Sequence, residues 1–97
     1  MSIQVVLELQ AAEGKADEMK AVLKKNLGDT RARSGCQGVT VHQDQDTPTT
    51  ILLLERWATR ADYESYLAWR AGPGAMPEMA TLVTGPPSIR YFDDVDA

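Results

Sequence analysis

The chain has 97 residues, of which 43% are hydrophobic and 25% are charged, a composition typical of globular proteins. Its formal net charge of −4 argues against a nucleic-acid partner, because phosphates need a basic surface. No apolar run approaches the roughly 20 residues that cross a bilayer, and the first residues lack a signal-peptide pattern. We therefore expect no membrane partner, a cytoplasmic location, and one domain over residues 1–97 that gains stability from dimerisation.

The first third of the chain predicts a strand followed by a helix. Residues 2–11 alternate apolar and polar side chains, as in a strand with one buried face. After Gly14, helical spacing runs from Lys15 to about Asn26, with residues 31–33 as a last turn beyond the weak point at Gly28. The apolar residues at this spacing are Met19, Val22, Leu23 and Leu27.

The middle of the chain predicts a hairpin of two strands. Residues 36–46 alternate again and end in a turn-rich segment that leads to Pro48. The following run, Ile51 to Leu54, is apolar at every position, which suits a strand in the middle of a sheet. Because strand side chains alternate between faces, Glu55 and Trp57 are expected side by side on one face.

A capped helix with an aromatic face is predicted next. The Thr59 hydroxyl can accept a hydrogen bond from the backbone N–H three residues on, and Asp62 places negative charge at the positive end of the helix. Helical spacing then aligns a stripe of side chains on one face. This stripe consists of Tyr63, Tyr66, Leu67 and Arg70, with Trp69 beside it.

The last quarter predicts a short helical segment and a final strand. Residues 71–74 break the helix, residues 76–83 show helical spacing, and residues 88–95 alternate as a strand. The order β-α-β-β-α-β is the ferredoxin-like α+β arrangement, an antiparallel sheet with both helices on one face. Since the third strand is apolar on both sides, we expect the other face to be covered by a second copy, giving a homodimer joined through the sheet faces.

Several short motifs occur together in one order along the chain. They are Arg33-Ser34-Gly35-Cys36 before a strand, Asp46-x-Pro48, Leu54-Glu55-Arg56-Trp57, the helix capped by Thr59, and Pro87-Ser88-Ile89 before the closing strand. In this order and spacing the chain resembles the antibiotic biosynthesis monooxygenase family of dimeric α+β barrel proteins. The resemblance implies a pocket between sheet and helices, and oxidation of a quinol or anthrone-like aromatic by O₂ without metal or cofactor.

The same resemblance leaves other functions open. Some members of the family bind and degrade haem, but relatives often carry a histidine about where this chain has Tyr66, and a haem ligand would be that imidazole. Its absence argues against the haem branch and favours a non-catalytic dimer that binds a small ligand. An RNA-recognition domain has the same topology, but the acidic balance and the aliphatic central strands exclude it.

Three residues are the catalytic candidates. His42 is the only imidazole and is the default general base if it faces the pocket; otherwise it lies on the outer or dimer face of its strand. Trp57 can line the pocket and donate its N–H to a substrate oxygen, or fill the core. Tyr66 can donate a hydrogen bond to an aromatic substrate. Besides these three candidates, Glu55 can act as a base if it is desolvated, or pair with an arginine.

The expected substrate-binding residues lie around these three, and packing is the competing role for each of them. They are Tyr63, Trp69, Arg70, Met76 and Met79. Arg70 can stabilise an oxyanion, and the two methionines can form an adaptable wall. The sequence shows no metal-spaced His/Cys set, no phosphate-binding glycine loop and no serine nucleophile motif.

Overall fold

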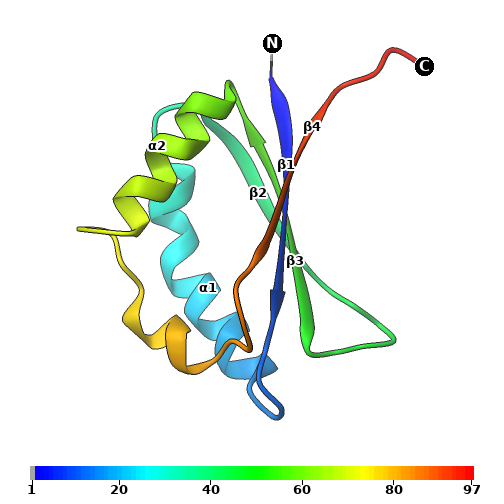
Figure 1. Cartoon of the computed structure of the whole chain (residues 1–97), viewed down its shortest axis with the longest axis vertical. Helices are drawn as coiled ribbons and strands as arrows, with labels where there is room; N and C mark the ends of the chain where they lie inside the picture. Colours follow the sequence, from blue (N-terminus) through cyan, green and yellow to red (C-terminus); the bar gives the residue numbers. More distant parts are fainter. Residues whose placement is uncertain (1) are drawn as a thin grey trace.

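The computed structural model describes residues 2–97, and its elements follow the predicted β-α-β-β-α-β order (Figure 1). Their bounds are β1 Ile3–Gln10, α1 Ala16–Arg31, β2 Cys36–Gln43, β3 Thr50–Trp57, α2 Arg60–Arg70, the 3₁₀ helix η1 Pro77–Thr81, and β4 Ser88–Asp93. The segment expected to be helical over residues 76–83 is thus a single 3₁₀ stretch, which begins with a proline. No helix among residues 2–97 is long and apolar enough to cross a membrane.

The four strands form one antiparallel sheet in the order β2-β3-β1-β4, with both helices on the same face (Figure 1). This is the ferredoxin-like fold expected from the sequence. β3 lies inside the sheet, as its continuous apolar run predicts, and every second residue from Ile51 to Trp57 is buried beneath the helices. β2 and β4 are the edge strands.

α1 continues through Gly28 to Arg31, several residues further than the expected end of its main body. Its buried residues extend the 19, 23, 27 spacing to Thr30, so the last turn is held by packing. A Cβ at Gly28 would meet no atom within 4 Å, so this glycine is exposed and costs the helix only conformational freedom, on the order of 1 kcal/mol.

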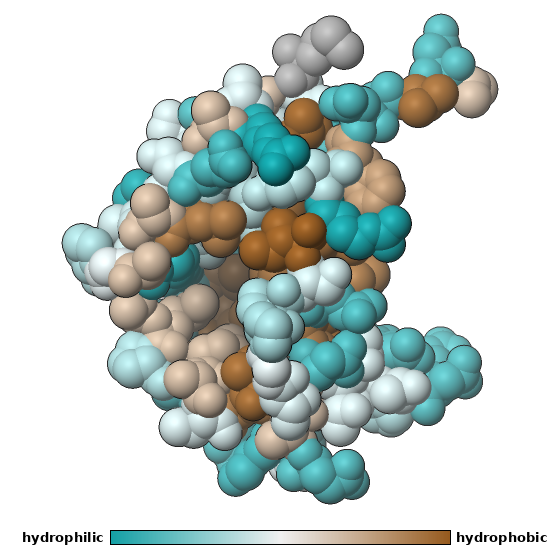
Figure 2. Space-filling model, in the orientation of Figure 1, coloured by the Kyte–Doolittle hydropathy of each residue, from teal (hydrophilic) through white to brown (hydrophobic). Residues whose placement is uncertain are grey.

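The space between helices and sheet contains two packed clusters. An aliphatic cluster lies beneath α1 and includes Met19, Leu23, Leu27, Ile51 and Leu53. An aromatic cluster lies beneath α2 and consists of Val5, Trp57, Tyr63 and Tyr66. Figure 2 shows apolar surface gathered in the middle of one face of the molecule, between α2 and the sheet.

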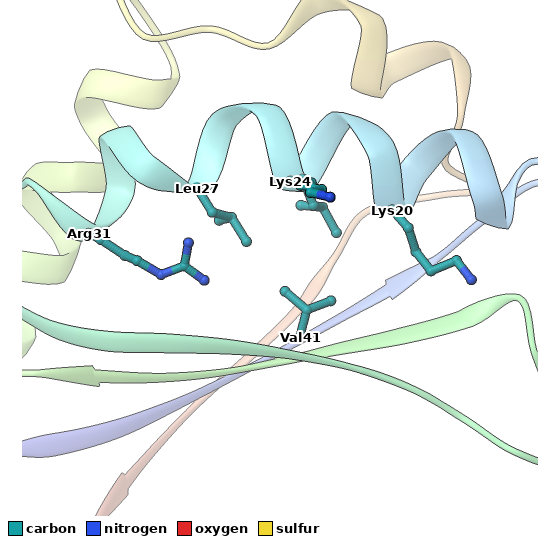
Figure 3. A pocket seen from close by; sticks show the side chains of 6 residues that line it. Lys20, Lys24, Leu27, Arg31 and Val41 are labelled. Atoms are coloured by element: carbon teal, nitrogen blue, oxygen red, sulfur yellow. The ribbon is translucent and has the colours of Figure 1, made fainter.

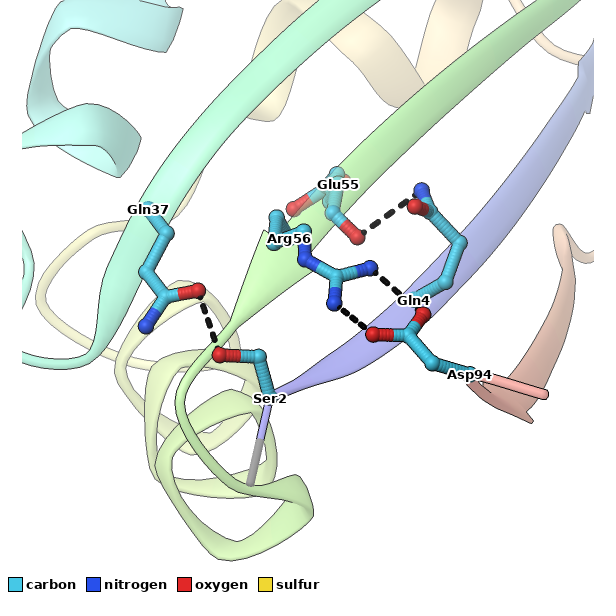
Figure 4. A network of polar contacts seen from close by, with 6 residues as sticks. All are labelled: Ser2, Gln4, Gln37, Glu55, Arg56 and Asp94. Atoms are coloured by element: carbon cyan, nitrogen blue, oxygen red, sulfur yellow. Dashed lines mark hydrogen bonds and ion pairs between the residues drawn. The ribbon is translucent and has the colours of Figure 1, made fainter. Parts of the chain in front are cut away.

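The sheet face away from the helices is partly polar. Gln4 on β1 donates its side-chain N–H to the Glu55 backbone carbonyl at 3.1 Å, and Arg56 binds the Asp94 carboxylate through both Nη atoms (Figure 4). Between these polar contacts lie apolar side chains that the helices do not cover. The register places Val6, Leu52, Leu54 and Phe92 on this face, which we call the open face.

Candidate active site

The aromatic cluster is built by the joint between β3 and α2. The Thr59 hydroxyl accepts a hydrogen bond from the Asp62 backbone N–H at 3.1 Å, the predicted cap of α2. With α2 beginning at this cap, Tyr63 and Tyr66 point toward the sheet and pack on Trp57, the last residue of β3. The Trp57 ring centroid lies 5.4 Å from that of Tyr63, edge-on at 70°, and 5.2 Å from that of Tyr66. Aromatic pairs at such distances add stability beyond the area they bury.

Glu55 is the buried acid of this site, with an exposure of 1%. It shares a face with Trp57, as the strand period predicts, and its Oε1 accepts a hydrogen bond from the Trp57 Nε1–H at 3.1 Å. Among residues 2–97, no arginine or lysine forms an ion pair with it. Burial raises the pKa of the Glu55 carboxyl above its ordinary value, while the indole hydrogen bond and the charge of Arg70 oppose this shift. The site therefore contains a carboxyl that gives up its proton less readily than usual.

A polar network ties Tyr66 to α1. The Tyr66 hydroxyl lies 2.8 Å from Thr30 Oγ1, and Arg70 Nε donates to it at 2.9 Å. Arg70 also donates through Nη2 to Thr30 Oγ1 at 2.9 Å and to the Asn26 carbonyl at 3.0 Å, and through Nη1 to the Gly74 carbonyl at 3.0 Å. The guanidinium thus joins both helices to the loop after α2. Its donors are used by the protein itself, and none of residues 2–97 supplies a carboxylate partner.

Tyr63 differs from Tyr66 in one respect. Its hydroxyl is buried and is the one buried side-chain oxygen or nitrogen of residues 2–97 that has no hydrogen-bond partner. Burial raises the pKa of this hydroxyl far above its ordinary value, and the nearby Glu55 charge adds to the effect. A buried polar group without a partner costs about 1–3 kcal/mol. Such an atom is suited to receive a polar group of a bound molecule.

These observations on fold and site agree with one known family. The model of the antibiotic biosynthesis monooxygenase family matches residues 2–74 of the sequence. The chain belongs to this family. A comparison with curated proteins finds no match.

Solved structures similar to this family member share its fold at low sequence identity. A conserved protein from Methanosarcina mazei Go1 is 20% identical with a TM-score of 0.81, and the alignment covers 95% of this chain and 91% of that one. A protein of unknown function from Nitrosomonas europaea is 22% identical with a TM-score of 0.81, over 99% and 91%. A Bordetella bronchiseptica protein, provisionally named an antibiotic biosynthesis monooxygenase, is 18% identical with a TM-score of 0.80, over 97% of each chain. At these identities the likeness shows the fold alone.

The remaining catalytic candidate of this antibiotic biosynthesis monooxygenase family member, His42, lies apart from the cluster. It is exposed on β2, paired in register with Leu52 on the open face, and its Nε2 lies 2.9 Å from Thr40 Oγ1. The sheet therefore separates His42 from Trp57 and Tyr66 of the same chain.

Trp69 packs against the aromatic cluster, and Met76 and Met79 follow it in the chain. The half-buried Trp69 ring has the guanidinium carbons of Arg33 and Arg70 at 4.5 and 4.7 Å from its centroid. A Cβ on Gly74 would overlap the Trp69 ring, so only glycine fits beneath it. Met76 precedes η1, and Met79 packs on the aliphatic cluster. Of the substrate-binding candidates, Tyr63, Trp69 and Arg70 thus lie together around Tyr66, and Met79 lies against the neighbouring cluster.

Two residues of this region were absent from the catalytic and binding candidates. Thr30, with an exposure of 0%, is the α1 partner of Tyr66, and its position in the 19, 23, 27, 30 spacing is the signal that could have identified it. Cys36 packs against both clusters, and burial raises the pKa of its thiol, which disfavours the thiolate. No group of three or more His, Cys, Asp or Glu side chains within residues 2–97 is arranged to hold a metal ion.

Proposed function

We propose that this protein is a cofactor-independent monooxygenase that oxidises a small quinol or anthrone-like aromatic with O₂. The observation that supports the proposal best is the Glu55 carboxyl, buried without a cationic ion-pair partner among residues 2–97, next to Trp57 and the unpartnered Tyr63 hydroxyl. A buried carboxyl with a raised pKa is a stronger base than an exposed one. It is therefore suited to take a proton from a phenol in a dry aromatic site.

The reaction needs no electron source other than the substrate. Loss of one proton makes the aromatic ring electron-rich, and the resulting anion gives an electron to O₂. The two radicals then join through a new carbon–oxygen bond. Breaking the O–O bond leaves one oxygen atom on the ring carbon, and the other leaves as water with two hydrogens from the substrate. For a quinol, the balance is one quinol and one O₂ to one hydroxyquinone and one water.

In the proposed mechanism Glu55 accepts the substrate proton, the role that the sequence alone assigns by default to His42. We assign it to Glu55 because His42 lies on the other face of the sheet. Trp57 lines the site and holds the Glu55 carboxylate through its indole N–H. Tyr63 donates its free hydroxyl to a substrate oxygen, and Tyr66 stacks on the ring. These groups stabilise the developing phenolate without bulk water.

Substrate entry requires the outer boundary of the cluster to move, because the aromatic side chains are closely packed. The mobile part proposed is the Trp69 ring with the loop at Gly74, next to Met76 and Met79. Methionine side chains adapt to different shapes, so these two suit a wall that reforms around a ligand. Arg70 limits the movement because it binds the Gly74 carbonyl and Tyr66 together.

We also propose a homodimer in which two open faces pack on each other. The support is the apolar content of this face: Phe92 is 40% exposed, and the register places Val6, Leu52 and Leu54 on the same face of the sheet. Burying these side chains removes apolar surface from water. Sedimentation at micromolar concentration tests this: a dimer is expected, and a clean monomer would contradict it.

Oxygen uptake tests the enzymatic proposal. The metal-free protein is mixed with a panel of quinols and anthrones, and uptake above the autoxidation rate is expected for at least one of them. Glu55→Gln keeps the side-chain volume but removes the base, and should lower kcat/KM by about 100-fold or more. His42→Ala is the matched control and should leave the rate unchanged. A rate that falls in His42→Ala but not in Glu55→Gln would overturn the assignment of the base.

A non-catalytic ligand-binding protein is the second candidate. The observation in its favour is that Tyr66 and Arg70 are engaged with Thr30 and with main-chain carbonyls, so part of the proposed site already serves the structure. In this case aromatic ligands of the panel should quench the tryptophan fluorescence, but oxygen uptake should stay at the autoxidation rate.

A further inference from the structure

A groove outside the aromatic cluster separates α1 from the edge strand β2 (Figure 3). It has a volume of about 380 Å³ and is lined by Lys20, Leu23, Lys24, Leu27, Arg31 and Val41. We call it the cationic groove. Three of its six lining residues carry positive charge, in a chain whose formal net charge is −4.

Both ends of the cationic groove are crossed by hydrogen bonds from α1 to β2. At one end Arg31 Nη2 donates to the Val39 carbonyl at 3.0 Å, and at the other Lys20 Nζ donates to Gln43 Oε1 at 3.1 Å. Edge strands are places where extended peptides add to a sheet through main-chain hydrogen bonds. Here Arg31 already occupies the Val39 carbonyl that an added strand would need. The closed ends and the blocked carbonyl favour a small ligand over a peptide.

The interior of the cationic groove combines an apolar floor with two charges that form no ion pair among residues 2–97. Leu23 and Leu27 form the helix side of the floor, and Val41 on β2, 37% exposed, forms the strand side. Lys20 is paired with Asp17 at 3.0 Å, whereas Lys24 and Arg31 form no ion pair among residues 2–97. Arg31 donates one N–H to the Val39 carbonyl, so Lys24 is the groove charge without a partner among these residues. In Figure 3 the cationic side chains lie along α1 above Val41. A ligand that is apolar along its length and anionic at one end would match both features.

We propose that the cationic groove binds a small monocarboxylate with an aliphatic body, the class of medium-chain fatty acids. The carboxylate pairs with Lys24, with Arg31 nearby, and the aliphatic body covers Leu23, Leu27 and Val41. The volume lies within the roughly 300–1,000 Å³ of small-molecule sites. The two hydrogen bonds that close the groove reach β2 at Val39 and Gln43, four strand positions or about 13 Å apart. This length limits the ligand to a short chain. This binding site is separate from the proposed oxygenase chemistry and does not depend on it.

The test is a titration of the whole protein with octanoate, followed by NMR of methyl-labelled side chains. Shifts are expected at the Val41 and Leu27 methyl groups. Acetate has the charge without the aliphatic body, and octanol has the body without the charge. Each should bind at least about fivefold more weakly than octanoate, where about fivefold corresponds to the roughly 1 kcal/mol of one surface ion pair. Binding should also weaken as salt is added, because the pairing is electrostatic.

Two variants and a control complete the test. Lys24→Gln should weaken octanoate binding about fivefold, and Val41→Asp, at a half-exposed position, should abolish it. Lys25→Gln removes the same charge from the neighbouring exposed residue, which does not line the groove, and should change nothing. The proposal is overturned if octanol or acetate binds as tightly as octanoate, if Lys25→Gln weakens binding as much as Lys24→Gln, if the shifts centre on the Val5 methyl groups of the aromatic cluster, or if millimolar octanoate shifts nothing. Since none of these readouts uses oxygen uptake, this result and that of the oxygenase assay are independent.

Discussion

Two tyrosines on α2 should respond in opposite directions when the hydroxyl is removed: one single variant should be more stable than the natural protein, and the other less stable. Tyr63 and Tyr66 are both buried against Trp57, three residues apart on the same helix. The Tyr66 hydroxyl contacts Thr30 Oγ1 at 2.8 Å and Arg70 Nε at 2.9 Å, whereas the Tyr63 hydroxyl has no partner in residues 2–97. Replacement by phenylalanine keeps the ring and deletes only the hydroxyl, so each variant is the control for the other.

The size of each effect follows from these contacts. Tyr66→Phe loses a neutral hydrogen bond, worth about 1 kcal/mol, and one from a charged donor, worth about 1.5–3 kcal/mol. We therefore expect the free energy of unfolding to fall by about 3 kcal/mol, which lowers the Tm of a domain of this size by more than about 10 °C. Tyr63→Phe removes an unsatisfied buried hydroxyl and should raise the free energy of unfolding by about 1 kcal/mol.

Urea unfolding measures both variants, with tryptophan fluorescence and far-ultraviolet circular dichroism as two probes. Equal m-values would show that the difference lies in stability and not in the compactness of the unfolded chain. Similar losses in both variants would refute the argument, because the Tyr63 hydroxyl would then have a partner. An unchanged Tyr66→Phe would show that the network with Thr30 and Arg70 contributes little.

Three further changes have expected outcomes. Burial raises the folded-state pKa of Glu55 above its ordinary value near 4.5. The protonated side chain therefore stabilises the folded state fully below pH 4.5, and this stabilisation is lost as the pH rises through the folded-state pKa. Glu55→Gln should therefore flatten the loss of stability toward neutral pH in urea unfolding followed from pH 4 to 8, and an unchanged profile would contradict the assignment. Gly74→Ala places a Cβ into the Trp69 ring and should cost about 1–3 kcal/mol with a shift in tryptophan emission. Arg70→Lys cannot reproduce the four hydrogen bonds of the guanidinium and should lower the free energy of unfolding by about 2–3 kcal/mol in the same assay; an unchanged value would contradict this role of the guanidinium.

Much of the fold could be predicted from the sequence because it depends on local patterns. The alternation in β1, the apolar run of β3 and the Thr59 cap of α2 each concern residues within one turn or a few strand positions. Boundaries were less predictable where distant contacts decide them. α1 passes Gly28 because Thr30 is buried against α2, and β4 ends at Asp93, two residues before the expected end.

The candidate site was predictable in part. The pairing of Glu55 with Trp57 on one face follows from the strand period, and the aromatic stripe of α2 follows from helical spacing. That Glu55 binds the indole and not an arginine was open in the sequence, because several arginines were available partners. The structure resolves it by directing Arg70 to Tyr66, Thr30 and main-chain carbonyls.

The sequence by itself determined the order of elements, the face on which each side chain lies within its element, and the family. Only the tertiary structure decided which faces meet: it joined Thr30 to Tyr66 across 36 positions, left the Tyr63 hydroxyl without a partner among residues 2–97, and put the sheet between His42 and Trp57. The physical reason is that periodicity is set by backbone geometry, which is local. Contacts between elements depend on how packed helices settle on a sheet, which requires all the side chains at once.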